Sequence, residues 1–444
     1  MTLLPAHAEA DRCPGALTLH EAADGLLARV RLPGGFVDPR VLRGLSALAS
    51  RFGDGRLELT SRGNVQIRSI GATDSELLGH DLAELGLLPS PTHERVRNIV
   101  ASPLAGLRDG GAGLASYVAA LDRALCATTE LQELSGRFLF AFDDGSGDVE
   151  PLRADVTARQ SATGWSVYPG GFRVPGGDPA WLAGVMVGVA GAFLNVRHRL
   201  DSTAWRISDL ANGAELVAEQ FATAHPEASE ASEALEALEA EASGAGVGRD
   251  LTGAAPVRFG GEALPPAGII AQPAGLSAVV VVAPLGRLSA SQADLLADLL
   301  VELTGDRPAR ITPWRSIVLP DVTEPGRVVQ LIRGGGLDCG DESIWNNLTA
   351  CAGRPGCAKS HADVQADAAR AVAVRRRVPD VADIVGLPGL PVHWSGCSRR
   401  CGHPNTPFVD VLAGPGGYTV SESGPSALTT SEPLHQPDQR AQTG

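Results

Sequence analysis

Lysine is almost missing from this chain of 444 residues: Lys359 is the only one, and nearly every cation is an arginine. The formal net charge is −14 and no basic domain stands out, which argues against nucleic acid as the main partner. Any site for an anionic ligand is therefore expected to be a local cluster of arginines in an acidic protein.

Long hydrophobic runs and a secretory leader are also missing. The longest apolar run, from Trp181 to Leu194, is shorter than the ~18 residues that a membrane span needs, so it predicts a buried helix and no membrane partner. The N-terminus lacks a basic start followed by a long apolar core. Seven cysteines are too few for a disulfide framework in a chain of this length, which favours a reducing, cytoplasmic location.

What the chain does contain is an internal repeat. The segments 15–70 and 267–322 each predict strand, strand, Pro-Gly-type turn, amphipathic helix and strand. The similarity continues beyond them, because "RNIVASPLAG" at 97–106 resembles "NNLTACAGRPG" at 346–356. Two homologous halves are expected, each a small βαβ-like module followed by a mixed αβ domain.

These patterns predict an α+β fold with a defined order of domains. Half-domains are expected at 1–88 and 263–338, αβ domains at 89–222 and 339–420, an acidic Ala/Glu linker at 223–262, and a disordered tail at 421–444. The Ala/Glu segment fits an exposed helix as well as a flexible linker.

The stretch "LELTSRGNVQIRS", residues 57–69, alternates apolar and polar side chains and predicts one half-buried strand. Its polar face ends in a row of forked donors formed by Arg62, Asn64, Gln66 and Arg68. A plain solvated face would usually mix Lys, Glu and Thr. The row therefore predicts a binding face for a large ligand rich in acceptors.

Four cysteines occur as two close pairs, Cys351-x5-Cys357 and Cys397-x3-Cys401. Zinc ribbons favour gaps of two residues within each pair, whereas wider and unequal gaps suit a [4Fe–4S] cluster. Glycine and proline crowd both loops, which lets backbone N–H groups approach the sulfurs. The remaining cysteines, Cys13, Cys126 and Cys339, have no such partners and are interpreted as packing residues.

Together, "LTSRGNVQIR", "RNIVASPLAG", the Cys-x5-Cys pair and "GCSRRC" resemble the sirohaem-dependent sulfite and nitrite reductase family. The resemblance implies two ferredoxin-like repeats joined into one module, with two αβ domains that hold a tetrapyrrole beside the cluster. It also implies that Arg62, Gln66 and Arg68, with Asn64 less clearly, grip the carboxylates of the macrocycle, for which a planar guanidinium is well suited. Arg97 lies in the second basic motif, "RNIVASPLAG", and Arg137 in the third, "LSGRFLF" at 134–140, and a structural role for either is equally open.

Two enzyme classes share this architecture. The reductases carry a lysine pair near the third motif. This chain has Arg137-Phe138-Leu139 there instead, and the side chain of leucine cannot donate a hydrogen bond to an oxyanion. The departure favours the other class, an oxygen-dependent enzyme acting on precorrin-3A in aerobic cobalamin synthesis. The Asp-Asp-Gly after Phe142 also resembles that class, although an ordinary turn explains it equally. A sirohaem-dependent reductase is the alternative, and a non-catalytic cluster or tetrapyrrole carrier is a third.

The favoured class implies dioxygen and a [4Fe–4S] cluster, with either the cluster or an additional non-haem iron to activate dioxygen. Electrons are expected from a separate reductase, because the sequence has no standard nicotinamide or flavin fingerprint. His361, His393 and His403 lie near the cluster motifs without the spacing of metal ligands, so structural roles are expected for them.

Overall fold

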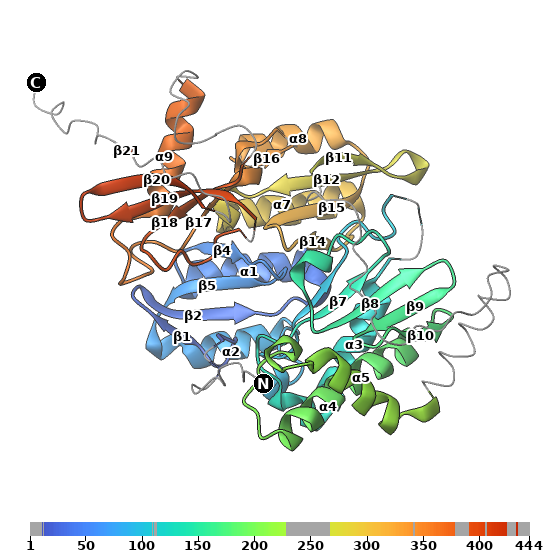
Figure 1. Cartoon of the computed structure of the whole chain (residues 1–444). Coiled ribbons are helices and arrows are strands. Elements are labelled where there is room, and N and C mark those ends of the chain that lie inside the picture. The colour runs from blue at the N-terminus through green and yellow to red at the C-terminus, as the bar shows by residue number, and fades with distance from the viewer. Residues whose placement is uncertain are drawn as a thin grey trace, which may run out of the picture.

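The computed structural model describes residues 11, 13–108, 110, 113–227, 267–340, 342–377, 390–404, 406–423 and 432–433. Most of the acidic linker and of the C-terminal tail expected from the sequence lies outside these residues. The described chain forms two central sheets, made from the repeated halves, and two outer sheets, one in each αβ domain (Figure 1). The α+β prediction is confirmed.

The two halves repeat one order of elements, as the sequence predicts. The first half comprises β1 His20–Ala22, β2 Gly25–Val30, β3 Phe36–Val37, α1 Pro39–Phe52, β4 Arg56–Leu59, β5 Val65–Ile70 and α2 Ser75–Glu84. The second comprises β11 Gly268–Ala271, β12 Ser277–Val282, β13 Arg287–Ser289, α7 Ala290–Thr304, β14 Ala309–Ile311, β15 Ser316–Val322, α8 Pro325–Gly334 and β16 Asp338–Cys339.

Each half gives one strand to the sheet of the other. The sheet orders are β1-β2-β5-β4-β13 and β11-β12-β15-β14-β3, so β13 pairs with β4 and β3 pairs with β14, both antiparallel. Helices α1 and α7 pack against each other, and their apolar residues belong to one core that includes Leu45, Leu296 and Leu300, each fully buried. The two halves therefore form one body.

The stretch 57–69 is a hairpin, so the prediction of a single strand is wrong. Strands β4 and β5 pair antiparallel, with Glu58 opposite Gln66. The turn between them is fixed by Thr60, whose Oγ1 accepts hydrogen bonds from the backbone N–H groups of Arg62 at 3.3 Å and Asn64 at 3.1 Å. Gly63 supplies the left-handed backbone (φ 66°) that reverses the chain. The sequence did not reveal the turn, because both strands keep their apolar residues on the buried face and the alternation of apolar and polar residues continues unbroken from one strand to the next.

The two αβ domains share one topology, three parallel strands followed by antiparallel ones. The first contains β6 Ile99–Ala101, α3 Ala115–Ala127, β7 Phe140–Asp143, β8 Val156–Ser161, β9 Gly164–Tyr168, β10 Phe172–Pro175, α4 Pro179–Arg199 and α5 Gly213–Ala224. The second contains β17 Leu348–Ala350, α9 Val364–Arg377, β18 Val392–Ser395, β19 Phe408–Gly414, β20 Gly417–Ser423 and β21 Glu432–Pro433.

Helix α4 is the one described helix that is long and apolar enough to cross a membrane by length and composition. It packs on α3, and 56% of the apolar window is buried inside the protein, including Phe193 and Met186 at 0% exposure. The predicted buried helix is confirmed, and it ends at Arg199 as its "RHR" sequence suggested.

Replacing Gly35 by alanine should disturb the contact between the two halves. A Cβ there would lie 2.0 Å from the carbonyl oxygen of Ile311 in β14, and the backbone is left-handed (φ 73°). Gly55 is the matched control, because it has φ 75° and a Cβ there would have no atom within 4 Å. Gly55→Ala should cost roughly 1–2 kcal/mol of unfolding free energy from backbone strain. Gly35→Ala should cost about 2 kcal/mol more because the halves must separate locally. Urea unfolding measures both, and equal losses would contradict the close approach.

Candidate functional site

The polar face of the β4–β5 hairpin lies beside a cluster of arginines contributed by three segments. Arg29 and Arg31 come from β2 and the residue after it, Arg62 from the hairpin turn, and Arg137 from the loop before β7. Arg62 donates to the carbonyl oxygen of Gly136 at 3.3 Å. Since a Cβ on Gly136 would lie 3.6 Å from Arg31 Nη2, this glycine marks where the segments meet.

Arg31 is the most unusual residue of the cluster. It is 2% exposed, and none of its three guanidinium nitrogens has a hydrogen-bond partner among the described residues. The pKa of its guanidinium is lowered to about 9, mainly by burial and in addition by the positive charges of Arg29 and Arg62. The charge of Glu94 acts in the opposite direction, but no ion pair to Arg31 is found among the described residues. A buried cation without an ion-pair partner costs several kcal/mol, so its surroundings suit an anionic ligand.

Arg62 shares this environment. Burial is the largest cause that lowers the pKa of its guanidinium to about 10, followed by the charge of Arg206. Arg137 is exposed and stacks over the ring of Trp205 at 4.6 Å. Cys13, expected to be a packing residue, lies here as well: burial raises the pKa of its thiol, whereas a hydrogen bond from Arg137 lowers it.

The other residues of the predicted binding face are engaged within the protein. Gln66 accepts from Arg29 Nε at 3.0 Å and donates to Glu58. Asn64 is 1% exposed and accepts from the backbone N–H of Leu32 at 2.9 Å. A role for either in tetrapyrrole binding stays a prediction.

Arg97 and Arg68 are each held by a carboxylate. Arg97 forms a two-point ion pair with Asp122, both N–O distances being 2.7 Å, and donates to the carbonyl oxygen of Leu87. Arg68 pairs with Asp24 and donates to the carbonyl oxygen of Gly356 at 3.0 Å, in the loop that carries Cys357. Each of the three guanidinium nitrogens of Arg97 thus already donates to an acceptor of the protein, and Arg68 joins the hairpin to the cysteine loop.

The sequence interpretation did not single out Arg31. A signal was present, since "ARVRLPGG" places two arginines two residues apart in an apolar strand, directly before a Pro-Gly-Gly turn. Period-two spacing puts both on the same face. What the sequence could not show is that Arg31 is buried without a partner.

Leu139, in the third motif, lies in an apolar environment. It is 2% exposed and belongs to an apolar cluster with Val100, Ala141 and Val149. Its backbone N–H donates to Asp155 Oδ2 at 2.9 Å, so the carboxylate nearest to it is already used. The Asp-Asp-Gly sequence after Phe142 is a turn in which Asp143 accepts from the N–H of Gly145.

The four paired cysteines come from two loops at one edge of the second αβ sheet. Cys351 follows β17, while Cys397 and Cys401 follow β18, which is the parallel neighbour of β17. Burial raises the pKa of the Cys351 thiol; the N–H groups of Gly396 and Gly353 oppose this, and the nearby Cys401 and Cys357 add to it. The N–H of Gly396 points at Cys351 Sγ at 3.1 Å.

These residues fit an iron–sulfur cluster. All four cysteines are free thiols, as a four-thiolate site requires, and backbone N–H groups directed at sulfur are typical of such sites. The neighbouring histidines do not join them. His393 is fully buried and its Nδ1 shares a hydrogen bond with Thr349 Oγ1 at 2.8 Å, while burial lowers the pKa of its imidazole to about 4. His403 Nδ1 lies 2.7 Å from the carbonyl oxygen of Pro404.

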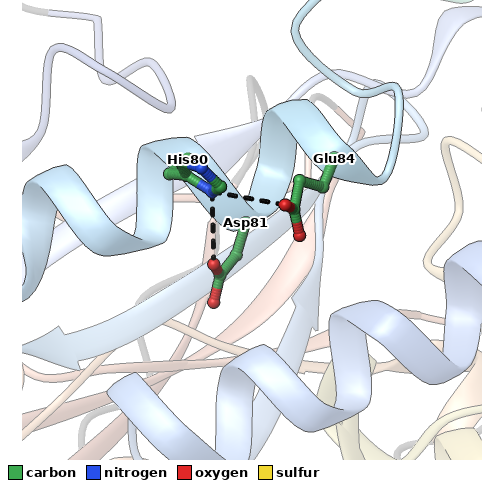
Figure 2. Close-up of side chains that lie close together, drawn as sticks. All are labelled: His80, Asp81 and Glu84. Atoms are coloured by element: carbon green, nitrogen blue, oxygen red, sulfur yellow. Dashed lines mark ion pairs between the residues drawn. The ribbon is translucent and has the colours of Figure 1, made fainter.

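A cavity of about 600 Å³ lies between the hairpin and the cysteine loop. Its walls come from β4, β5, β13, the loop 352–356 and the start of α9. By contrast, the only group of possible metal ligands with side-chain atoms within 4.8 Å of one another in the described residues is on α2, outside the lining of this cavity (Figure 2). It consists of His80, Asp81 and Glu84. Asp81 already pairs with Arg51 at 2.8 Å, and His80 and Glu84 are exposed and one helical turn apart, so no site is assigned there.

The comparisons with known proteins agree with this arrangement. The nitrite/sulfite reductase ferredoxin-like half domain matches twice, at residues 20–85 and 270–325. The structure of the NirA protein of Mycobacterium tuberculosis has the same fold, with a TM-score of 0.60, 20% identity, and coverage of 92% of this chain and 77% of that chain. Both half-domain segments and the overall fold are therefore similar to those of the nitrite/sulfite reductases, as the sequence motifs implied.

Two relatives are similar to this chain over most of their length. A precorrin-3B synthase from Sinorhizobium sp is 26% identical over 94% of this chain and 84% of its own. The ferredoxin–nitrite reductase of Synechococcus elongatus is 24% identical over 87% of this chain and 76% of its own. A ferredoxin sulfite reductase of Mycolicibacterium paratuberculosis is 34% identical over a shorter region, 29% of this chain and 23% of its own.

Replacing Cys357 by Ala should sharply lower the iron and acid-labile sulfide bound by the purified protein, because a cubane cluster needs all four thiolates presented together. Cys126→Ala is the matched control: Cys126 is also a half-buried free cysteine, but it lies on α3 in the other αβ domain. Iron and sulfide analysis measures both variants. Unchanged contents in Cys357→Ala would exclude Cys357 as a ligand.

Proposed function

We propose that this chain is a precorrin-3B synthase, which uses dioxygen and a reductant to hydroxylate precorrin-3A and close a lactone in aerobic cobalamin synthesis. Precorrin-3A is an acidic tetrapyrrole, and the substrate site would be the arginine cluster beside the β4–β5 hairpin. The unpartnered guanidinium of Arg31, buried next to Arg62, is the observation that carries this assignment. The similarity to the Sinorhizobium synthase over most of both chains supports it.

The residues have separate tasks in this proposal. Arg31 and Arg62 bind substrate carboxylates, for which charge-assisted hydrogen bonds are strong. Asn98 donates to the carbonyl oxygens of Gly136 and Phe138 and so holds the third motif against the hairpin. Cys351, Cys357, Cys397 and Cys401 would hold a [4Fe–4S] cluster, which supplies one-electron transfer when bound. The electrons would come from a separate reductase.

A sirohaem-dependent nitrite or sulfite reductase is the second candidate, favoured by the similarity to the Synechococcus enzyme. Arginines at the same cluster would then hold a small oxyanion above a resident tetrapyrrole. Against it stands Leu139, which is buried in an apolar cluster where an oxyanion reductase needs a cation that can deliver protons. Lys359, the only lysine, lies in the cysteine loop region and is exposed.

Arg62→Ala should weaken tetrapyrrole binding by roughly ten- to a hundredfold, because each charge-assisted contact contributes about 1.5–3 kcal/mol. Arg31→Met should weaken it similarly and also raise the unfolding free energy by about 1–4 kcal/mol, since it removes a buried unpaired charge. Equilibrium titration with precorrin-3A and urea unfolding measure the two effects. Wild-type affinity in folded variants would mean that the cluster serves another ligand.

Turnover should require dioxygen. Incubation with precorrin-3A and a reductant is followed by mass, aerobically and anaerobically, with folded Arg62→Ala as the control for substrate binding. A mass gain only in the aerobic sample, together with no reduction of nitrite or sulfite, is the expected result. Steady reduction of nitrite or sulfite by protein with tightly bound sirohaem would instead establish the second candidate.

A further inference from the structure

The binding face is not uniform in charge. At the end near Gly136, the guanidinium of Arg31 has no hydrogen-bond partner among the residues that the structure describes, and that of Arg62 donates to one backbone carbonyl. At the other end, the cavity beside the cysteine loop is lined by equal numbers of both signs: Arg56, Arg68, Arg287 and Arg354 against Asp24, Asp54, Glu58 and Asp363. The two ends therefore offer different environments to a polyanionic ligand.

Asp24 neutralises the cation that β5 presents to the cavity. Its carboxylate takes two hydrogen bonds from Arg68, from Nε at 3.1 Å and from Nη2 at 2.9 Å, and a third from Ser69 Oγ at 3.1 Å. Both side chains of the ion pair are about nine-tenths buried. Burial by itself would raise the pKa of the Asp24 carboxyl, but Arg68 lowers it below its ordinary value, so the carboxylate is ionised at neutral pH.

Glu58, on β4, likewise lies beside cations of the neighbouring strands β5 and β13. Its Oε1 lies 3.2 Å from Arg287 Nη2, and its Oε2 lies 4.0 Å from Arg68 Nη1. The same Oε2 accepts from Gln66 Nε2 at 3.2 Å. The Glu58 carboxylate thus lies between cations from two strands, Arg68 of β5 and Arg287 of β13, and all three side chains line the cavity.

We propose that Asp24 and Glu58 are specificity-determining residues that act as built-in counter-ions. They cancel the cations at the cysteine-loop end of the face, so carboxylates of the macrocycle are bound at the Arg31–Arg62 end alone. The most anionic edge of the substrate is thereby oriented toward Gly136, and the opposite edge lies in a charge-balanced space next to the loop of Cys351 and Cys357. The inference rests on the proposed function, since it needs a polycarboxylate ligand on this face.

Fluorescence titration with uroporphyrin I, a metal-free porphyrin with eight carboxylates, tests the inference on the full chain carrying its cluster. Asp24→Asn removes the carboxylate that pairs with Arg68, and Glu58→Gln removes one of the two carboxylates beside Arg287, the other being Asp54 at 3.1 Å. Each should strengthen porphyrin binding at least fivefold at low salt, with the gain lost at high salt. Asp122→Asn is the matched control, because Asp122 holds Arg97 in the same two-point geometry outside the lining of the cavity. It should leave the affinity within twofold of wild type.

The outcomes separate this inference from the proposed function. If Arg62→Ala weakens binding while folded Asp24→Asn and Glu58→Gln bind no more tightly than wild type, the counter-ion role is wrong and the proposed site stands. An equal gain in Asp122→Asn also overturns it, because the effect would then follow net charge alone. If Arg62→Ala binds like wild type, both the proposed site and the inference fail. Should one of the two variants not fold, the other decides.

Discussion

The exchange of strands between the halves is the constraint on which the rest of the structure depends. Backbone pairing of β3 with β14 and of β13 with β4 makes neither sheet complete without the other half. The close approach of Gly35 to Ile311 is part of that joint. Because β13 borders β4, residues of the second half, such as Arg287, reach the binding face of the first. The joint also fixes where the second αβ domain places its cysteine loop against β5, through Arg68 and Gly356.

Duplication followed by divergence explains why the two halves differ in function. The hairpin turn is built alike in both, since Thr312 Oγ1 accepts from the N–H groups of Trp314 and Ser316 as Thr60 does from Arg62 and Asn64. The faces beyond the turn differ. In the second half, Val318 packs with Ala278 and Val280 against Leu104 and Leu107 from the loop after β6. This face is sealed by apolar contacts, so only the first half keeps a polar face for a ligand.

The binding face balances stability against recognition. Burying Arg31 without a partner is unfavourable in the protein as described, and it becomes favourable when an anion arrives with its own charge. Asp24 and Glu58 limit this cost to one end by pairing the cations there. The carboxylates of the ligand are spread over a whole macrocycle, so several orientations would otherwise bind with similar free energy. An uneven distribution of charge on the protein favours one of them, because the two ends of the face make different contacts.

The sequence by itself determined the repeated halves, the four clustered cysteines and the absence of a cation at Leu139, because these depend on local pattern, spacing and residue type. It also predicted a polar face at 57–69. Alternation of period two could not distinguish one strand from a hairpin, because the turn keeps odd-numbered residues on the apolar face in both strands. Only the tertiary structure decided which arginines are free. Arg97 and Arg68 lie in basic motifs but meet Asp122 and Asp24, whereas the described part of the chain offers the buried Arg31 side chain no hydrogen-bond partner. Pairing of charges joins residues distant in sequence, so it follows from packing and not from any local pattern.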